Sequence, residues 1–351
     1  MHMADALLSP AVGGTMWAVS AGTIAYCSKK VHQELDDRYV PFMGVLGAFL
    51  FAAQMINFTI PATGSSGHLG GGLLLTILLG PCAAFLTIAS VLVVQALFFA
   101  DGGLLALGCN IFNLGFIPAF VVYPFIYLKI IRTDPDRTRL VTAIMISAIA
   151  GLQLGPFAVV LETWISGISA LPFVTFTLLM QPIHLAIGVV EGLVTVAVVI
   201  FVSRVRPEIL FFVPAARPGD GVSLRGMLTS FLAAAILTGG VVSWFASHNP
   251  DGLEWAIARV TGAEEMKGPK QGLHGTLAVV QKTTAFMPEY AFRKSPEPKP
   301  EVTKYEGMGK KDAVERLGTS TAGIIGTLIT LGLVFGSGLL LKKRNQPADV
   351  S

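Results

Sequence analysis

A methionine followed at once by a histidine begins this chain, and such a pair can act as a compact metal chelator. The α-amine of Met1, the backbone nitrogen of His2 and the Nδ1 atom of the His2 ring can close two fused rings around one cation. These nitrogens leave one vacancy in a square plane, and a second imidazole such as that of His68 can fill it. Four nitrogens in a plane suit Ni(II) or Cu(II) better than Zn(II), which prefers tetrahedral sites.

The chelate depends on an intact N-terminus. We expect Met1 to be retained because His2 is bulky, so that Met1 itself supplies the amine. No charged region precedes the first apolar run, and we therefore expect no secretory signal peptide, whose removal would destroy the site. Because the nitrogen ligands must lose protons to bind a cation, we expect affinity to fall sharply below about pH 6. The alternative is a histidine without a role on a frayed terminus.

The loop that contains His68 offers partners for its imidazole. Residues 60–68 are rich in glycine, serine and proline and carry no formal charge. Metal-ligating imidazoles are commonly oriented by a second hydrogen bond. Asn57, Ser65 and Ser66 are candidates for that role by their proximity in sequence. The alternative for all three residues is ordinary turn chemistry.

The composition is that of a helical membrane protein. Of the 351 residues, 53% are hydrophobic and only 13% are charged, whereas a soluble domain has about 25% charged residues. Apolar runs of about 18 residues or more recur, which predicts an all-α, polytopic fold. The net charge of +3 implies no nucleic-acid partner. Cys27, Cys82 and Cys109 lie in apolar segments without paired spacing, and we interpret them as buried hydrophobic residues.

Nine membrane spans account for the apolar runs. The segment 70–100 is too long for one ordinary span, and we expect two short helices that are separated at Gly80-Pro81. The other expected spans are 11–28, 40–58, 104–131, 140–161, 172–202, 224–246 and 319–341.

The basic loops predict the orientation of the chain. With nine spans, loops 29–38, 129–139, 204–225 and 342–344 all lie on one side of the membrane. The positive-inside rule makes that side cytoplasmic, so the N-terminus is outside and the C-terminus inside. His2 and His68 then share the outer face, as a joint metal site requires.

The chain reads as two polypeptides joined near residue 215. The first unit, 1–215, has seven spans. The second unit, 216–351, has two spans, at about 224–246 and 319–341, around an external loop, 247–317. Within that loop, Lys294 to Lys304 is rich in proline, lysine and glutamate, which favours an extended spacer.

Three motifs resemble those of one transporter family. The start Met-His-Met-Ala-Asp-Ala-Leu-Leu-Ser-Pro resembles the N-terminus of the substrate-binding M component of nickel and cobalt energy-coupling-factor (ECF) transporters. The blocks at 54–58 (Gln-Met-Ile-Asn-Phe) and 64–71 (Gly-Ser-Ser-Gly-His-Leu-Gly-Gly) resemble the second signature of that family. The segment 249–254 (Asn-Pro-Asp-Gly-Leu-Glu) is similar to the Pro-Asp-Gly-Leu-Glu signature of the auxiliary N component, which is often fused to the M component in nickel systems.

The resemblance implies a function and partners. It implies a seven-helix bundle with a C-terminal two-helix hairpin, in the inner membrane of a bacterium, that imports Ni(II) without an organic cofactor. It also implies that Met1, His2 and the loop histidine, which is His68 by position, hold the ion. Two cytoplasmic ATPases would drive transport through a transmembrane coupling subunit. The chain has no Gly-x-x-x-x-Gly-Lys-Ser/Thr motif, so we expect no ATPase activity of its own.

The family commonly has Ile-Pro-Asp after Met-His, whereas this chain has Met3-Ala4-Asp5. The acid at position 5 and the chelating atoms are kept. A role of proline in fixing the path of the N-terminus is therefore in doubt.

Other histidines and acids compete for the role of ligand. Gln181, His184 and Glu191 are three and seven residues apart and share one face of an expected helix. Ionisable groups in spans mark functional sites by default, so this face is a candidate for the ion path or the coupling surface, and a structural His–Glu pair is the alternative. We interpret His32 as solvated on an inner loop. His248 and His274 lie in the external loop, either as nickel-capturing residues or as chance surface positions.

Three other functions remain open. The same machine could carry Co(II), which these ligands accept, although the planar donor set and the affinity order favour nickel. A stand-alone, ion-coupled permease would show inverted repeats and charged midplane residues. We find no such repeat, and Glu191 is the one acid deep in a span, with Glu162 near a span end. An intramembrane metalloenzyme is disfavoured because the chain has no His-Glu-x-x-His motif.

Overall fold

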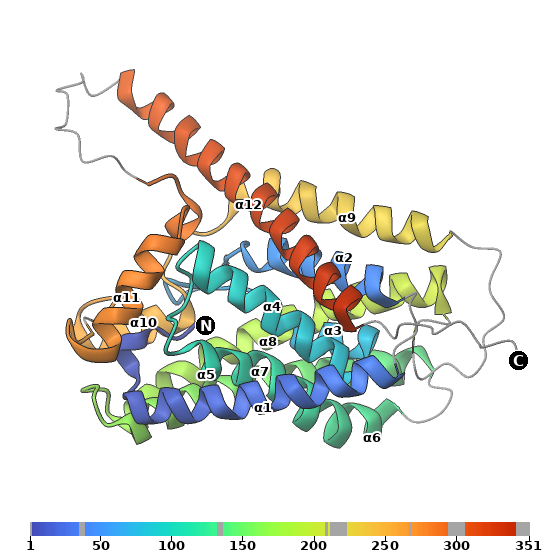
Figure 1. Ribbon diagram of the computed structural model, residues 1–351, viewed down its shortest axis with the longest axis horizontal. Helices are drawn as coiled ribbons and strands as arrows, with labels where there is room; N and C mark the ends of the chain where they lie inside the picture. Colours follow the sequence, from blue (N-terminus) through green and yellow to red (C-terminus); the bar gives the residue numbers. More distant parts are fainter. Residues whose placement is uncertain are drawn as a thin grey trace, which may run out of the picture.

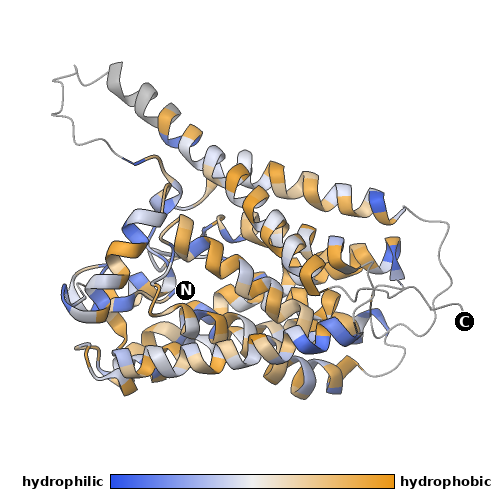
Figure 2. Cartoon of the chain, in the orientation of Figure 1, coloured by the Kyte–Doolittle hydropathy of each residue, from blue (hydrophilic) through white to orange (hydrophobic). Residues whose placement is uncertain are grey.

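The computed structural model describes residues 2–34, 39–131, 136–207, 210, 223–266, 268–293 and 306–341. Long helices run side by side in one bundle (Figure 1). Apolar residues dominate the middle of that bundle, and hydrophilic residues gather towards its two ends (Figure 2). This pattern matches the expected all-α membrane fold, which is confirmed.

The first unit is a bundle of helices in which both consecutive and distant helices are neighbours, as α1 is of α4 and α5. The strongest neighbouring pair is α7 with α8, and α3 and α4 form a tight pair. The elements are α1 (Pro10–Glu34), α2 (Tyr39–Gln54), α3 (Gly72–Leu79), α4 (Pro81–Phe98), α5 (Leu107–Ile111), η2 (Phe112–Tyr127), α6 (Leu128–Ile131), α7 (Arg137–Ser166) and α8 (Phe173–Val205). The segments α5, η2 and α6 form one continuous helix, whose middle part, η2, is a π-helix that contains Pro118 and Pro124.

Five helices of the described chain are long and apolar enough to cross a membrane, and two shorter apolar helices, Val40–Gln54 and Leu224–Gly240, accompany them. The expected break at Gly80-Pro81 is present. Gly80 has a φ of 76°, and Pro81 is the first residue of α4, where no backbone N–H is needed for a hydrogen bond within the helix. The division of 70–100 differs from expectation. The eight residues of α3 rise only roughly 12 Å, so α3 is too short to cross a membrane by itself.

A short hairpin and a non-helical segment connect α2 to α3. The strands β1 (Phe58–Ile60) and β2 (Ser65–Gly67) pair antiparallel, with Thr59 opposite Ser66. The chain from His68 to Gly71 is neither helix nor strand, with Gly71 left-handed at a φ of 73°, and it enters the bundle before α3 begins. Because this non-helical segment already covers part of the distance into the bundle, the helix α3 that follows it is short.

The second unit has more structure than the sequence indicated. Within the predicted loop 247–317, the structure contains two helices, α10 (Gly252–Thr261) and α11 (Gly272–Thr284), and the short turn η5 (Pro288–Tyr290). The helix α9 (Leu224–Gly240) ends before the predicted residue 246 and is followed by η4 (Val242–Phe245), and α12 (Glu306–Leu341) begins before the predicted residue 319. The predicted spacer, the predicted junction near residue 215 and Met1 lie outside the described residues.

The helices α9 and α12 lie against α2 and against one another, whereas α10 and α11 gather at the end of the bundle where the N-terminus lies (Figure 1). The contact between α9 and α12 depends on two glycines. A Cβ atom on Gly323 would lie 2.1 Å from the carbonyl oxygen of Gly239, which is too close for any side chain. Small residues allow such close helix packing in membranes.

This contact predicts the effect of a larger side chain. We expect Gly323→Leu to separate α9 from α12 and to lower the stability by about 1–3 kcal/mol, because the opposing backbone cannot move aside without cost. Gly332→Leu, on the same helix, is the matched control, since no atom lies within 4 Å of its Cβ position. Thermal unfolding of both variants in detergent measures the difference, and equal unfolding temperatures would contradict the prediction.

Candidate metal centre

The N-terminal segment is buried in the bundle rather than frayed. The backbone nitrogen of Met3 donates to Oδ1 of Asn110 at 2.8 Å, and Gly103 N donates to the Met3 carbonyl at 2.8 Å. The Met3 side chain is fully buried, and Oδ1 of Asp5 accepts from the nitrogen of Ala106. A side chain on Gly103 would collide with the Asp5 carboxylate, so a glycine is required there. These contacts fix the position of residue 2.

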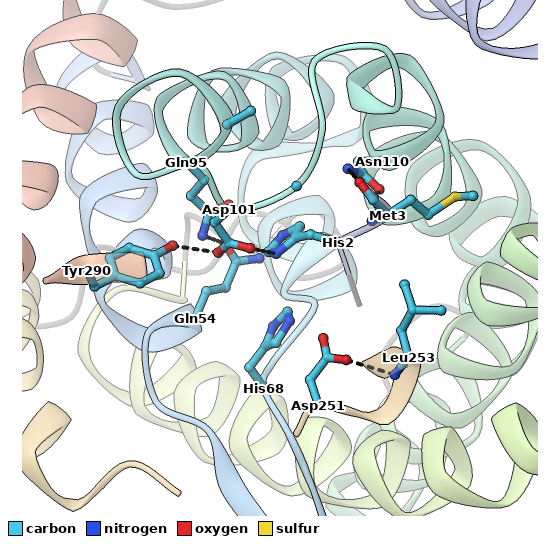
Figure 3. Close-up of polar contacts among 12 residues, drawn as sticks. His2, Met3, Gln54, His68, Gln95, Asp101, Asn110, Asp251, Leu253 and Tyr290 are labelled. Carbon is cyan, nitrogen blue, oxygen red and sulfur yellow. Dashed lines mark hydrogen bonds and ion pairs between the residues drawn. The ribbon is translucent and has the colours of Figure 1, made fainter. Parts of the chain in front are cut away.

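His2 faces the ring of His68. The two imidazoles are stacked with their centroids 5.0 Å apart and an interplanar angle of 16°, and the His2 side chain is only 4% exposed. Figure 3 shows His2 between Asp101 and His68. The structure therefore brings together two of the three predicted ligands, whereas Met1, the third, lies outside the described residues.

Asp101 holds the His2 ring from the other side. Nδ1 of His2 lies 2.8 Å from Oδ1 of Asp101, and the Tyr290 hydroxyl donates to Oδ2 at 2.6 Å (Figure 3). Burial would raise the pKa of the Asp101 carboxyl, but His2 and Tyr290 together hold it well below its usual range. In this structure the nitrogen that the chelate requires is thus engaged by a carboxylate, while Nε2 of His2 is buried without a hydrogen-bond partner.

The His68 imidazole is kept neutral. Its Nδ1 atom lies 3.0 Å from the Leu69 carbonyl, an oxygen that can only accept, so this nitrogen carries the proton. Burial lowers the pKa of His68 to about 3. A neutral ring with a carbonyl behind it is the form in which histidine binds metals.

The non-helical segment after His68 is held by buried polar side chains. Gly70 N donates to Oε2 of Glu191 at 2.6 Å, and Gly71 N donates to Oε1 of the same residue at 3.2 Å. From the other side, Gln54 Nε2 donates to the Gly70 carbonyl at 2.9 Å. Glu191, predicted as a candidate for the ion path, thus anchors the backbone next to His68.

The second unit closes over this centre. Ser66 N donates to the Pro250 carbonyl at 2.8 Å, and Ser66 and Asp251 are bridge partners next to β2. Asp251 caps α10 by accepting from the backbone nitrogens of Leu253 and Glu254. Figure 3 shows Asp251 and His68 on the same side of His2.

Two more contacts from α11 reach the N-terminal region. His274, predicted to be either a capture residue or a chance surface position, is buried, and its Nε2 lies 2.8 Å from the Leu8 carbonyl. Gln281 Nε2 donates to the carbonyls of Ala96 and Gly102 on either side of Asp101. The second unit therefore contacts both the N-terminal segment and the turn that carries Asp101.

The other candidate residues have different partners. The Asn57 carbonyl accepts from Ser247 N, and the Ser65 hydroxyl lies 2.9 Å from that of Thr63, which is turn chemistry. Gln181 exchanges hydrogen bonds with the backbone of Gln153 across α7 and α8. Of the remaining histidines, His32 and His248 are exposed. Glu162 accepts from Nδ2 of Asn113 at 2.8 Å inside the bundle.

A cavity of about 860 Å³ opens in front of the two stacked rings. Its wall includes His2, His68, Asp101 and Asp251. Among the described residues, no group of three or more histidine, cysteine and acidic side chains is arranged to hold a metal ion. A site here therefore needs ligands other than these side chains, as the chelate hypothesis requires.

Asp101 and Tyr290 were not predicted as site residues. The sequence Asp101-Gly102-Gly103 resembles any polar turn, although a lone acid that ends an apolar span on the His68 side is a usable signal. Tyr290 gives no local signal, since it comes from another unit and 189 residues separate it from Asp101.

Comparison with known proteins finds two family matches along the chain. The family described as "Cobalt uptake substrate-specific transmembrane region" matches residues 2–209, and the PDGLE domain matches residues 225–343. Together these matches cover most of the sequence, in the order in which the predicted units occur.

Individual relatives are metal transport proteins. The chain is 34% identical over 211 residues to a metal transport protein of Haloquadratum walsbyi. This match covers 60% of this chain and 94% of that protein. It is 27% identical over 313 residues to the fused nickel transport protein NikMN of Rhodobacter capsulatus, covering 83% and 88% of the two chains. A crystal structure of a truncated transition metal transporter matches with a TM-score of 0.50 and 32% identity, over 58% of this chain and 99% of that one.

The buried, neutral His68 predicts a pH dependence of the metal-free protein. Its pKa is about 3 when folded and about 6.5 when unfolded, so the unfolded chain binds the proton first as the pH falls. The contribution to stability is complete above pH 6.5 and decreases below it, by about 1.4 kcal/mol between pH 7.5 and 5.5. We expect His68→Gln to lose less stability over this range than the wild type. Thermal unfolding at both pH values tests this, with exposed His248→Gln as the control that should behave like the wild type.

Proposed function

The chain belongs to the family described as the cobalt uptake substrate-specific transmembrane region and is a component of metal uptake, and on this premise we propose that it is the substrate-binding subunit of an ECF-type nickel importer. The single observation that carries this proposal is the stacking of the His2 and His68 rings, 5.0 Å apart, at the buried start of the chain. A chain that only traverses the membrane has no need to bury its first residues against a second imidazole. The substrate is Ni(II), bound by the Met1 amine, the backbone nitrogen and Nδ1 of His2, and His68.

Asp101 has a role in both states of this site. In this structure it is the partner of Nδ1 of His2. Metal binding requires His2 to give up this contact, by a rotation of its side chain that turns Nδ1 away from Asp101. Nδ1 then reaches the cation, while the Nε2 proton is donated to the carboxylate, the usual second bond of a metal-ligating histidine. The same anion also offsets the positive charge that the metal brings into a buried site.

The neutral state of His68 supports binding at neutral pH. Its ring presents a lone pair without first losing a proton, because burial has already lowered its pKa. The protons that binding releases come from the Met1 amine and the backbone amide of His2. The cost of deprotonating a backbone amide is offset by a d8 cation in a planar field, which favours Ni(II) over ions of other geometry.

The two matched regions suggest a division of labour. We assign residues 1–215 to the metal-binding M component and 216–351 to the N component. The contacts of Tyr290 with Asp101 and of His274 with Leu8 support a role of the N component in holding the N-terminal segment in place. A cytoplasmic pair of ATPases and a transmembrane coupling subunit supply the driving force, in an inner membrane where the N-terminus is outside and the C-terminus inside.

A two-residue extension tests the chelate. We expect Gly-Ser added ahead of Met1 to abolish high-affinity Ni(II) binding, because it removes the amine and shifts His2 out of ring-closing register. His2→Ala and His68→Ala should each lower the affinity by about 100-fold or more, whereas exposed His248→Ala should match the wild type. Metal analysis and titration of the purified chain measure these effects. Full affinity in the extended chain would refute the proposed site.

A second candidate substrate is Co(II), which is favoured by the description of the matched family. We expect the site to bind Ni(II) more tightly than Co(II), since four nitrogen ligands in a plane suit Ni(II) better. In cells that contain the partner subunits, uptake of labelled nickel should resist an equal concentration of cobalt, and the reverse result would assign cobalt. Uptake that persists without the ATPases and coupling subunit would instead indicate a stand-alone permease.

A further inference from the structure

A further histidine, His184, lies buried next to the candidate metal centre. His184 is on α8, eleven residues from the first residue of that helix, which is a rise of roughly 16 Å into the bundle. Its side chain is completely buried. The start of α10 covers it, because a Cβ atom on Gly252 would lie 3.0 Å from Cε1 of His184.

The hydrogen bonding of His184 fixes its tautomer. Nδ1 lies 2.7 Å from the Met180 carbonyl, and an oxygen of this kind can only accept, so Nδ1 carries the proton. Nε2 then presents a lone pair, and it has no hydrogen-bond partner among the described residues. A ring that donates one N–H to a backbone carbonyl and leaves the other nitrogen bare has the arrangement of a histidine prepared for a metal ion.

His184 and His68 face the same space. A small pocket is lined by both rings together with Asp251, Gly252 and Gly70. The pocket is too narrow to hold a water molecule, so water does not satisfy Nε2 of His184. Leaving the buried Nε2 atom of His184 without a hydrogen bond costs free energy of folding, and no neighbour among the described residues offsets that cost.

We propose that His184 is a second, transient ligand for the transported divalent cation, which passes from the N-terminal chelate to a position between His68 and His184. This inference rests on the proposed function and extends it by one step into the bundle. His68 is the ligand that both positions share, since it stacks on His2 and also lines the pocket of His184. Because the pocket is too narrow for a water molecule, the start of α10 must move aside before an ion and any water that accompanies it can enter.

The weakness of such a site suits transport. In the described chain, no third histidine, cysteine or acid completes a metal-binding cluster with these two rings. A site with few protein ligands binds an ion well enough to receive it and weakly enough to release it. The start of α10 must move for the ion to reach Nε2, so the second unit covers this step.

The first test separates binding from transport. We expect His184→Ala to retain the nickel affinity of the purified full chain within about threefold, because the chelate is intact, and to lower nickel uptake at least about tenfold in cells with all partner subunits. Val199→Ala, a truncation of another fully buried residue of α8, should leave uptake near the wild-type rate. Wild-type uptake in His184→Ala would overturn the proposal.

The second test detects the ligand directly and does not depend on transport. In a His2→Ala background, His184→Cys should give a thiolate-to-metal charge-transfer band with Co(II), and His184→Ser should give none. Both proteins keep Cys27, Cys82 and Cys109, so the difference reports position 184 alone. Absence of the band overturns the proposal. This result holds even if His184→Ala lowers uptake, because misfolding alone can lower uptake. A wild-type chain that binds no nickel would instead refute the proposed function, before residue 184 is changed.

Discussion

A non-helical backbone inside an apolar bundle must find all its hydrogen bonds within the protein, and this constraint shapes the region around His68. No water or lipid headgroup can serve the amides of Gly70 and Gly71, and each unpaired group would cost several kcal/mol, of the order of 2–7 kcal/mol. Glu191 and Gln54 meet this need from two different helices. Buried polar residues in the spans thus permit the non-helical segment that carries His68.

The two units depend on one another at the same end of the molecule. The second unit supplies Tyr290 to the carboxylate beside His2 and Asp251 to the wall beside His68. These residues stand on short helices and turns, whereas the ligands themselves lie on the N-terminal segment and a loop of the first unit. The bundle provides a rigid frame, and the short helices α10 and α11 cover the cavity.

The sequence predicted the helical membrane fold and the family, because long apolar runs and three motifs carry that information locally. It also placed His2 and His68 on one face, and the structure stacks their rings. The partners of these rings could not be predicted, since the pairing of Asp101 with Tyr290 joins residues from two units and depends on the folded path of both. The helices α10 and α11 escaped prediction because, at 10 and 13 residues, they are short segments within a polar stretch that was interpreted as one loop. The role of Met1 as a metal ligand and the position of the junction near residue 215 stay predictions.

The tethering of the N-terminal segment has a consequence for the assembly of the protein. The first residues to leave the ribosome pack against the chain near residues 103–110 and are bonded at Leu8 by His274, more than 260 residues later in synthesis. Their final position therefore forms only after both units have been inserted and have met. The candidate metal centre is therefore completed late in biogenesis. In a truncated or stalled chain that lacks α11, the N-terminal segment would lack its contact with His274.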